Sequence, residues 1–415
     1  MVPNGWCEGR IGDLLDGLES GVSVNGEDRN FGTNEKAVLK VSAVTYGSFN
    51  PAAAKVIDGE ELERAKTNPK RGQVIISRSN TEELVGASAY VEQDYPNLFL
   101  PDKLWQTIPK AHSDMKWLSY VLASNHARYT LSNLATGTSG SMKNITKGEL
   151  LSLKILIPPA SEQNKIAQIL STWDKAITTA EQLLANSQQQ KKALIQQLLT
   201  GRKRLLDKSG VRFSGEWKFQ TISQISKRIQ RKSDGEEHPI LTISSLSGFV
   251  RQDERYSRYM AGESVKNYIL LQKGEFAYNK GNSKTFEFGC IFDLENFETG
   301  LVPHVYVCFK LNSGLSHRYF KYLFEADYLK PQLGALVNTG VRNNGLLNIK
   351  PTEFMATHVP VPSFDEQERI ADLLHASSQT IHNLEQKLEA LKQEKKALMQ
   401  QLLTGKRRVK VEEAA

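Results

Sequence analysis

The feature that most constrains this chain is a long segment that occurs twice. Residues 161–201 (SEQNKIAQILSTWDKAITTAEQLLANSQQQKKALIQQLLTG) and residues 365–405 (DEQERIADLLHASSQTIHNLEQKLEALKQEKKALMQQLLTG) align without a gap. Glu162-Gln163 matches Glu366-Gln367, an offset of 204 residues that also superimposes the two Gln-Gln-Leu-Leu-Thr-Gly ends. Any fold for this chain must therefore accommodate an internal repeat.

Both copies carry a heptad pattern, with spacings that alternate between four and three residues. The positions are Ile166, Leu170, Trp173, Ile177, Ala180, Leu184, Ser187, Lys191, Leu194 and Leu198 in the first copy, and Ile370, Leu374, Ser377, Ile381, Leu384, Leu388, Leu391, Lys395, Leu398 and Leu402 in the second. A period of 3.5 residues requires a partner helix along the whole seam. We predict two long helices that pair with each other; the alternative is that each helix packs separately on its own domain.

The direction of pairing decides the architecture. A helix of this length extends about 57 Å, and the connection over residues 202–216 is short by comparison. This favours an antiparallel coiled coil, in which the two halves are related by a pseudo-two-fold axis. Lys191 and Lys395 are expected to set the register or to lie at the edge of the seam, with their ammonium groups in water.

The ends of both helices carry local signals. Ser161 is the candidate N-cap of the first, and Asp365 with Glu368 resembles a capping box at the start of the second. Gly201 and Gly405 follow the last Leu-Leu-Thr, where a residue in the left-handed region would close each helix.

The segments that precede the helices predict two globular domains of mixed α/β type. The expected organisation is a first domain (1–160), a first helix (161–201), a linker (202–216), a second domain (217–364), a second helix (365–405) and a charged tail (406–415). In the first domain strands are expected at 37–42, 73–77, 98–100 and 152–157, with helices at 60–68 and 115–132. The second domain repeats this layout with almost no identity, and a helix is expected at 317–329.

Composition limits the class of protein. The 415 residues carry a net charge of +7, a mild excess that favours a polyanionic partner. Cys7, Cys290 and Cys308 have no paired spacing, which indicates a reducing compartment and neither a disulfide framework nor a zinc site. No secretory leader or long apolar run occurs, so we expect an intracellular protein with no membrane segment.

With these features the chain resembles the specificity (S) subunits of type I restriction–modification systems. The resemblance rests on Pro158-Pro-Ala-Ser-Glu-Gln163 and Pro362-Ser-Phe-Asp-Glu-Gln367, each opening a helix that ends in Gln-Gln-Leu-Leu-Thr-Gly and basic residues. The strand motifs at Gly72 and Gly274, and the glycine-containing loops before Asn144 and Asn348, complete it. It covers essentially the whole chain.

The resemblance implies two target-recognition domains joined by two helices in an antiparallel coiled coil. It also implies a cytoplasmic subunit that binds double-stranded DNA, reads a bipartite target with one half-site per domain, and docks methyltransferase (modification) and restriction/translocase subunits. S-adenosylmethionine, ATP and Mg²⁺ are then expected on those partners, and no cofactor on this chain. Two-fold related domains suit the quasi-symmetry of a duplex, and the coiled coil would act as a ruler for the unread spacer.

Basic residues in or beside loops are the candidate DNA contacts, since Arg suits guanine and Lys suits phosphate. They are Arg71, Arg78, Lys103, Lys143 and Lys147 in the first domain and Arg251, Arg255, Arg258, Lys280, Lys284, Arg342 and Lys350 in the second, with Tyr256, Tyr259 and Tyr278 interleaved. Arg78 and Lys280 rank first because they follow equivalent strands. Any of these side chains could equally be ordinary solvated surface. The basic ends 202–204 and 406–408 could bind phosphates, bind a partner subunit or complement the helix termini.

Nothing in the sequence predicts an enzyme. Phosphate-binding loops, His-Glu-x-x-His and dinucleotide fingerprints are absent, and Asp102 beside Lys103 is typical of a turn rather than a nuclease site. Two alternatives stay open: a coiled-coil scaffold that spaces two protein- or glycan-binding modules, and a recognition subunit that acts with a separate nuclease.

Overall fold

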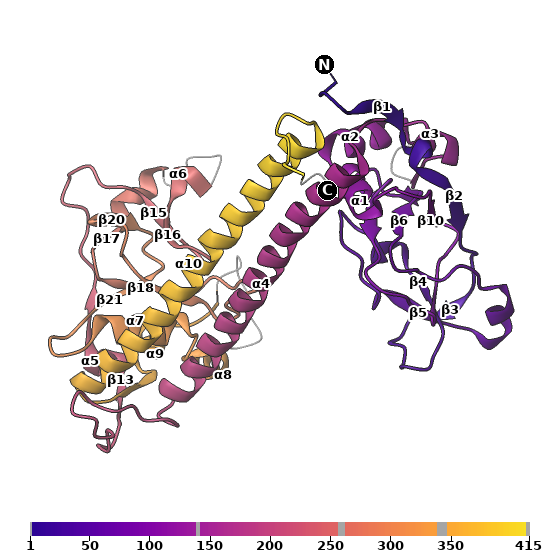
Figure 1. The fold of residues 1–415 in the computed structure, drawn as a ribbon. Helices are drawn as coiled ribbons and strands as arrows, with labels where there is room; N and C mark the ends of the chain where they lie inside the picture. The colour runs from indigo at the N-terminus through magenta and orange to yellow at the C-terminus, as the bar shows by residue number, and fades with distance from the viewer. Residues whose placement is uncertain (1, 138–141, 256–261, 338–346, 412–415) are drawn as a thin grey trace. The chain divides into compact units, whose positions relative to one another are not determined.

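The computed structural model describes residues 2–137, 142–255, 262–337 and 347–411, which form two compact units. Unit 1 comprises residues 1–181 and 386–415, and unit 2 comprises residues 182–385. Both long helices are divided between the units, because α4 (Ala160–Leu198) and α10 (Phe364–Leu403) each begin in one unit and end in the other. Figure 1 colours the ribbon by residue number, so that both long helices can be followed from beginning to end.

Unit 1 is built around a four-stranded antiparallel sheet. Its order is β2 (Leu15–Ser20), β10 (Leu104–Pro109), β6 (Val74–Ser77) and β8 (Ser88–Tyr90). A second sheet has the order β3 (Gly26–Glu27), β5 (Ala54–Ile57), β4 (Ala37–Leu39) and β9 (Leu98–Phe99). Two strand pairs complete the unit, β1 (Cys7–Arg10) with β12 (Lys154–Ile157) and β7 (Ser79–Asn80) with β11 (Lys143–Asn144).

The helices of unit 1 are interspersed among its strands along the chain. They are η1 (Ile11–Leu14), η2 (Val41–Ala43), η3 (Gly59–Arg64), α1 (Met115–Ala123), α2 (Asn125–Leu134) and α3 (Lys147–Leu151).

Unit 2 repeats the central sheet in the same order. Its strands are β14 (Ser226–Ile229), β21 (Val307–Leu311), β18 (Phe276–Asn279) and β19 (Cys290–Asp293). Three further pairs are β13 (Lys218–Thr221) with β22 (His358–Val361), β15 (Leu241–Ser244) with β16 (Gly248–Arg251), and β17 (Ile269–Gln272) with β20 (Thr299–Val302). Its helices are α5 (Ile222–Ile225), α6 (Gln252–Arg255), η4 (Gly262–Asn267), α7 (His317–Glu325), α8 (Lys330–Leu336) and α9 (Pro351–Met355).

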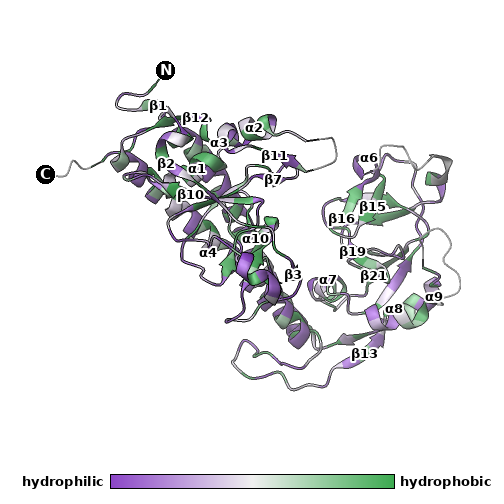
Figure 2. Ribbon diagram, turned by 90° about the vertical axis from the view of Figure 1, so that its right-hand side faces the viewer, coloured by the Kyte–Doolittle hydropathy of each residue, from purple (hydrophilic) through white to green (hydrophobic). Residues whose placement is uncertain are grey.

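Each central sheet is buried on both faces. In β6, Val74 and Ile76 belong to the core shared with the helices, whereas Ile75 belongs to the core under the second sheet. In β18, Phe276 and Ala277 divide between two cores in the same way. Successive side chains of a strand point to opposite faces of the sheet, so neighbouring residues enter different cores. Figure 2 shows the hydrophobic residues concentrated within each unit.

The two long helices pair antiparallel in both units. In unit 1, Asp174 pairs with Lys395 at 2.5 Å and Glu181 with Lys392 at 2.8 Å, so one helix ascends in number as the other descends. In unit 2, Leu198 at the end of α4 shares a core with Ile370 at the start of α10. All twenty predicted seam positions are buried or half-buried. The mixed α/β fold with an antiparallel helix pair is therefore confirmed.

Several local predictions need correction. The expected helix over 115–132 is two helices, because Ser124 ends α1 and its hydroxyl accepts the N–H of Ala127 as the N-cap of α2. The expected helix over 60–68 is the short 3₁₀ segment η3. Ser161 is not the N-cap of α4, since that helix already begins at Ala160. Glu368 binds the hydroxyl of Ser316 rather than closing a capping box on Asp365.

The predicted helix ends are confirmed. Gly201 and Gly405 lie in the left-handed region, with φ of 69° and 67°. The first residues of α4 and α10 also have a shared role that the heptad pattern did not predict. Glu162, Gln163, Glu366 and Gln367 are all buried and are fixed by hydrogen bonds to their own unit.

Candidate nucleic-acid interface

Three of the predicted DNA contacts in unit 1 meet at one place. Arg78 follows β6, and its backbone N–H donates to the carbonyl of Lys103 at 3.0 Å. The carbonyl of Arg78 accepts the N–H of Ile145, the residue that follows β11. Lys143, within β11, pairs with Asn80 of β7. We call Arg78, Lys103 and Lys143 the β11 edge.

The side chains of the β11 edge are held by neighbouring groups without being buried. Arg78 Nε donates to the carbonyl of Asp102 at 2.8 Å, and its Nη2 lies 3.4 Å from the Asp102 carboxylate. Lys103 Nζ lies 3.4 Å from the sulfur of Met142, and Lys143 Nζ donates to the carbonyl of Gly137 at 3.3 Å. Asp102 is thus part of a turn that orients a basic side chain. The edge flanks residues 138–141, which lie outside the described part of the chain.

The other two candidates in unit 1 lie elsewhere. Arg71 precedes β6, at the opposite end of that strand from Arg78, and its backbone N–H donates to Asp94. Lys147 opens α3, and its ammonium group donates to the carbonyl of Leu18 in β2 at 2.8 Å. The sequence grouped five basic residues, and the structure brings three of them together.

Unit 2 has an equivalent edge with different side chains. Lys280 follows β18 as Arg78 follows β6, its carbonyl accepts the N–H of Leu347, and its Nζ lies 3.3 Å from the carbonyl of Ile349. Lys350 comes next in the chain and is exposed, as is Lys284 in the loop after β18. The predicted equivalence of Arg78 and Lys280 thus has matching local geometry in the two units.

The remaining candidate arginines of unit 2 lie in or beside the β15–β16 hairpin or lie outside the described residues. Arg251 forms an exposed ion pair with Asp253, with nitrogen–oxygen distances of 3.1 and 3.0 Å. Arg255 Nη1 donates to the carbonyl of Ile243 at 2.7 Å. Arg258 and Arg342 fall within 256–261 and 338–346 and have no structural description.

One of the interleaved tyrosines is excluded as a DNA contact. Tyr278 is fully buried, its ring stacks on Phe354 at 4.4 Å, and its hydroxyl donates to the carbonyl of Phe288. Both faces of β18 are buried, so this side chain lies in the core although several of its neighbours in the sequence are basic. Tyr256 and Tyr259 lie outside the described residues.

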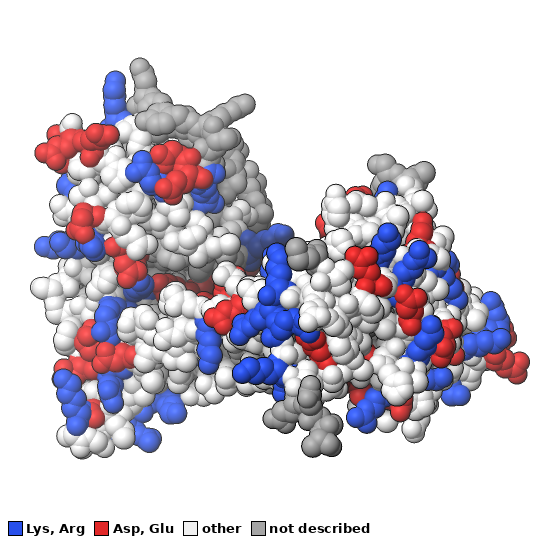
Figure 3. Space-filling model, turned by 45° about the horizontal axis from the view of Figure 1, so that its top comes forward, with Lys and Arg blue, Asp and Glu red and all other residues white. Residues whose placement is uncertain are grey.

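Figure 3 shows Lys and Arg interspersed with Asp and Glu over the face turned to the viewer. Two residues of the basic ends are engaged within the protein, because Arg204 and Arg408 pair with Glu366 and Glu162. Lys395 also pairs across the helices, although the sequence led us to expect its ammonium group in water.

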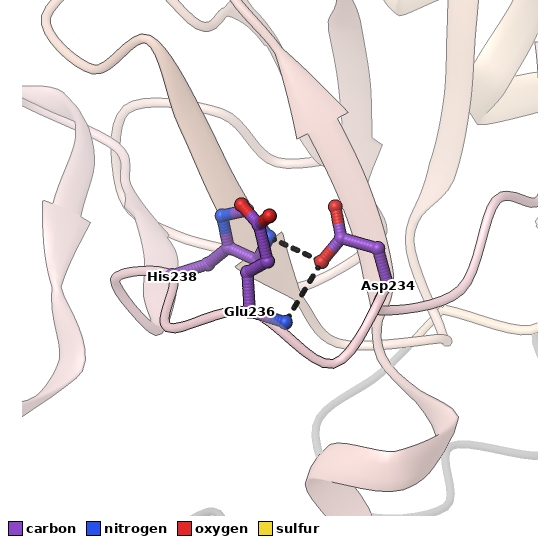
Figure 4. A group of neighbouring side chains, drawn as sticks. All are labelled: Asp234, Glu236 and His238. Carbon is purple, nitrogen blue, oxygen red and sulfur yellow. Dashed lines mark hydrogen bonds and ion pairs between the residues drawn. The ribbon is translucent and has the colours of Figure 1, made fainter.

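A group of possible metal ligands lies in unit 2 before β15. Figure 4 shows Asp234, Glu236 and His238 facing one another. His238 Nε2 lies 2.7 Å from Asp234 Oδ1, and its Nδ1 lies 2.9 Å from the hydroxyl of Thr299, so both ring nitrogens already have partners. The bond from His238 lowers the pKa of Asp234. We interpret this group as a turn closed by its own hydrogen bonds.

Burial keeps two of the three cysteines as unreactive thiols. All three are free thiols, and Cys290 and Cys308 are buried in β19 and β21. Burial raises the pKa of each of these two thiols to about 12, which keeps them protonated at neutral pH. Among the described residues, no helix combines the length and the apolar character that crossing a membrane would need.

Comparison with known proteins places this geometry in a family. The family described as "Type I restriction modification DNA specificity domain" matches residues 3–186, which span most of unit 1. Over its matched residues the chain is similar to the specificity subunits of type I restriction–modification systems. The resemblance inferred from the paired Glu-Gln helix starts is confirmed.

One relative aligns with almost the full length of this chain, and another aligns with two thirds of it. A protein named as the type I restriction enzyme MjaX specificity subunit of Methanocaldococcus jannaschii is 22% identical over 444 residues, covering 99% of this chain and 95% of the relative. The MjaVIII specificity subunit of the same organism is 24% identical and covers 67% of this chain and 68% of the relative. The crystal structure of the type I system S subunit from M. genitalium has a TM-score of 0.59 at 15% identity, covering 97% of this chain and 98% of that chain.

These likenesses indicate the broad class of function. The domain matched over residues 3–186 is described as a DNA specificity domain, and the relative that aligns over 99% of this chain is named as a specificity subunit. The solved S subunit structure shares the fold of this chain.

Proposed function

We propose that each unit of this specificity subunit reads one half of a bipartite DNA target, through the β11 edge in unit 1 and the equivalent edge around Lys280 in unit 2. The single observation that carries this proposal is the repetition of one backbone frame with different side chains. The strand orders β2-β10-β6-β8 and β14-β21-β18-β19 are the same, whereas Arg78 in one frame stands where Lys280 stands in the other. Two similar frames with different basic groups suit two different half-sites.

The chemistry of the two edges supports different readouts. The Arg78 guanidinium keeps Nη1 available while Asp102 orients the rest of the group, and an oriented arginine can donate two hydrogen bonds to guanine. Lys280 is a point charge that suits phosphate. The other candidates (Arg71, Lys147, Arg251, Arg255, Arg258, Lys284, Arg342 and Lys350) remain within the proposal as supporting contacts.

The antiparallel helices suit a second role in this proposal. We place the methyltransferase subunits and the restriction/translocase subunit on the long helices, with S-adenosylmethionine, ATP and Mg²⁺ on those partners. The helix faces that turn away from the seam are exposed over most of α4 and α10 and alternate in charge, so they offer surface for partner helices. A cytoplasmic location belongs to the same proposal, since the ligand is DNA and all three cysteines are free thiols.

Mapping of methylated motifs tests the proposal directly. Long-read sequencing of cells with the wild-type subunit should give one motif with two specified parts and an unread spacer. Arg78→Ala should relax one base pair of one part, at a cost of about 1–3 kcal/mol for that pair, and leave the other part unchanged. A motif with a single specified block, or loss of both parts together, would contradict it.

A salt series separates this function from a protein- or glycan-binding scaffold. Fluorescence anisotropy with a labelled duplex should give a steep negative slope of log affinity against log salt. A flat dependence would favour the scaffold.

A further inference from the structure

Each unit contains a latch made of one tryptophan, one glutamate and one arginine. In unit 1, Glu162 at the start of α4 accepts Trp6 Nε1 at 2.8 Å and accepts Nε and Nη2 of Arg408, both at 2.8 Å. Arg408 lies over the indole ring of Trp6, with its Cζ 5.8 Å from the ring centre. The carboxylate thus joins the first residues of the chain to the end of α10.

The latch of unit 2 has the same geometry. Glu366 at the start of α10 accepts Trp217 Nε1 at 3.0 Å and the Arg204 nitrogens Nε and Nη2 at 2.6 and 2.7 Å. The Cζ of Arg204 lies 5.6 Å from the centre of the Trp217 ring. Because α4 begins in unit 1 and α10 begins in unit 2, each latch holds the end of the helix that started in the other unit.

Glycines allow this close approach. A Cβ at Gly405 would lie 2.3 Å from Cγ of Pro3, and one at Gly201 would contact the ring of Trp217 at 3.4 Å. Both glycines have positive φ, so the helix end turns directly onto the tryptophan segment. Burial would raise the pKa of Glu162, but the hydrogen bonds from Arg408 and Trp6 outweigh it and lower the pKa.

The two latches differ in how the chain supports them. Arg204 and Trp217 are joined by the linker residues 205–216, so an opened latch in unit 2 keeps its parts at high effective concentration. Arg408 binds the carbonyl of Asn4, 404 residues away along the chain, and no short segment joins the two. The Arg408 side chain is also more accessible, at 42% exposed against 21% for Arg204.

We propose that the Trp6–Glu162–Arg408 latch is a positioning device that keeps the two reading units in one register on DNA. It adds side-chain bonds to the packing of Leu398, Leu402 and Val409 against the unit 1 core at the end of α10, whereas the linker adds a covalent connection to the same joint in unit 2. Opening the unit 1 latch leaves the end of α10 held by its apolar packing, whereas opening the unit 2 latch leaves the joint both packed and tethered by the linker. The DNA part of this inference rests on the proposed function.

Limited trypsin digestion tests the latch without DNA. Glu162→Gln and Glu366→Gln remove the same carboxylate from the two latches, and Glu181→Gln is the matched control because its ion pair with Lys392 is exposed on both sides. Cleavage at residues 406–408 should accelerate about tenfold or more in Glu162→Gln, because no tether restores the contact. Cleavage at 202–204 in Glu366→Gln should accelerate by less than about threefold, as expected for a tethered joint. Equal acceleration in the two variants, or none, would overturn the inference.

A DNA-binding experiment tests whether the latch fixes the spacing between the two half-sites that the protein reads. Duplexes carrying the mapped motif, with its native spacer or with one base pair added or removed, are compared by anisotropy with the full chain in its co-expressed complex. Wild type and Glu181→Gln should discriminate against altered spacers, and Glu162→Gln should bind all three duplexes within about threefold. If wild type does not discriminate, the proposed function fails; if Glu162→Gln still discriminates, the latch inference fails.

A second variant keeps the test decisive if Glu162→Gln does not fold. Arg408→Gln changes an accessible side chain, and Arg408→Lys keeps the charge but loses the paired donors. Arg408→Gln should reproduce the loss of spacer discrimination, and Arg408→Lys should restore part of it at an unchanged melting temperature. Retention of full discrimination in Arg408→Gln would refute the inference.

Discussion

Lys395 on α10 and Asp174 on α4 form an ion pair across the two helices, with 2.5 Å between Nζ and Oδ1. The other oxygen of Asp174 accepts the hydroxyl of Tyr120 at 2.5 Å. At the offset of 204, the corresponding positions hold Lys191 and Ser378, so the second copy lacks this carboxylate. Lys191 lies instead over the ring of Tyr322. The two aligned helices are therefore fastened to their units by different chemistry.

Removal of this carboxylate should weaken unit 1. Asp174→Ser, which copies the residue of the second helix, should lower the free energy of unfolding by about 1 kcal/mol, because Lys395 and Tyr120 both lose a partner. The control Glu181→Gln should stay within about 0.5 kcal/mol of wild type, as expected for an exposed pair. Urea denaturation followed by circular dichroism measures both. Equal effects would show that the half-buried environment adds nothing.

The buried glutamines that open the long helices should be more sensitive. Gln367 accepts the N–H of Ser316 at 2.9 Å and donates to the carbonyl of Pro362 at 2.8 Å. Gln367→Leu leaves both backbone groups unpaired and should cost about 2–4 kcal/mol of unfolding free energy. Gln393→Leu, at an exposed position on the same helix, is the control and should cost less than about 0.5 kcal/mol. A small effect for Gln367→Leu would mean that water replaces the amide.

A lysine of the β11 edge should contribute to affinity for every DNA sequence alike. Lys143→Ala should weaken binding to specific and unrelated duplexes by the same factor and reduce the salt slope by about 1. Lys66→Ala removes the same charge from an exposed position away from the candidates and should leave the slope unchanged. Anisotropy titrations at several salt concentrations give the slopes. A change in sequence preference for Lys143→Ala would instead assign it to base readout.

Unit 2 should carry a pH-dependent carboxyl at the end of α7. Burial raises the pKa of Asp327 from 3.8 to about 6, even though Lys330 opposes the shift. The folded protein therefore holds a proton that the unfolded chain has released. The stability from this protonation is fully present below about pH 4 and is lost as the pH rises to about 6.

Replacement of that carboxyl should reveal the effect. Asp327 has φ of 55°, a conformation that asparagine also tolerates. Asp327→Asn should therefore raise the free energy of unfolding at pH 7.5 by about 1 kcal/mol, discounted for the solvent exposure of the group, and change little at pH 4. Urea denaturation at the two pH values measures the difference. The same gain at both values would show that the carboxyl does not titrate in this range.

Prediction from the sequence succeeded best where a periodic pattern extended over many residues. The heptad positions and the helix-closing glycines all lie where expected, because the spacing of residues along one continuous segment sets the helical seam. Short elements were less predictable. Ser124 divides the expected helix over 115–132, since a capping side chain competes with the backbone on a scale of one turn. Tyr278 was grouped with basic neighbours, although both faces of its strand are buried and its side chain lies in the core.

The sequence by itself determined the repeat, the two helices and the family resemblance, because these depend on order and spacing along the chain. Only the tertiary structure decided which charged side chains meet. Arg408 and Glu162 look like a basic tail and a helix start until folding brings positions 246 residues apart within 2.8 Å. The same holds for Arg78 and Lys103, which share an edge through bonds between strands. Such contacts depend on how strands and helices pack, and no local pattern encodes that.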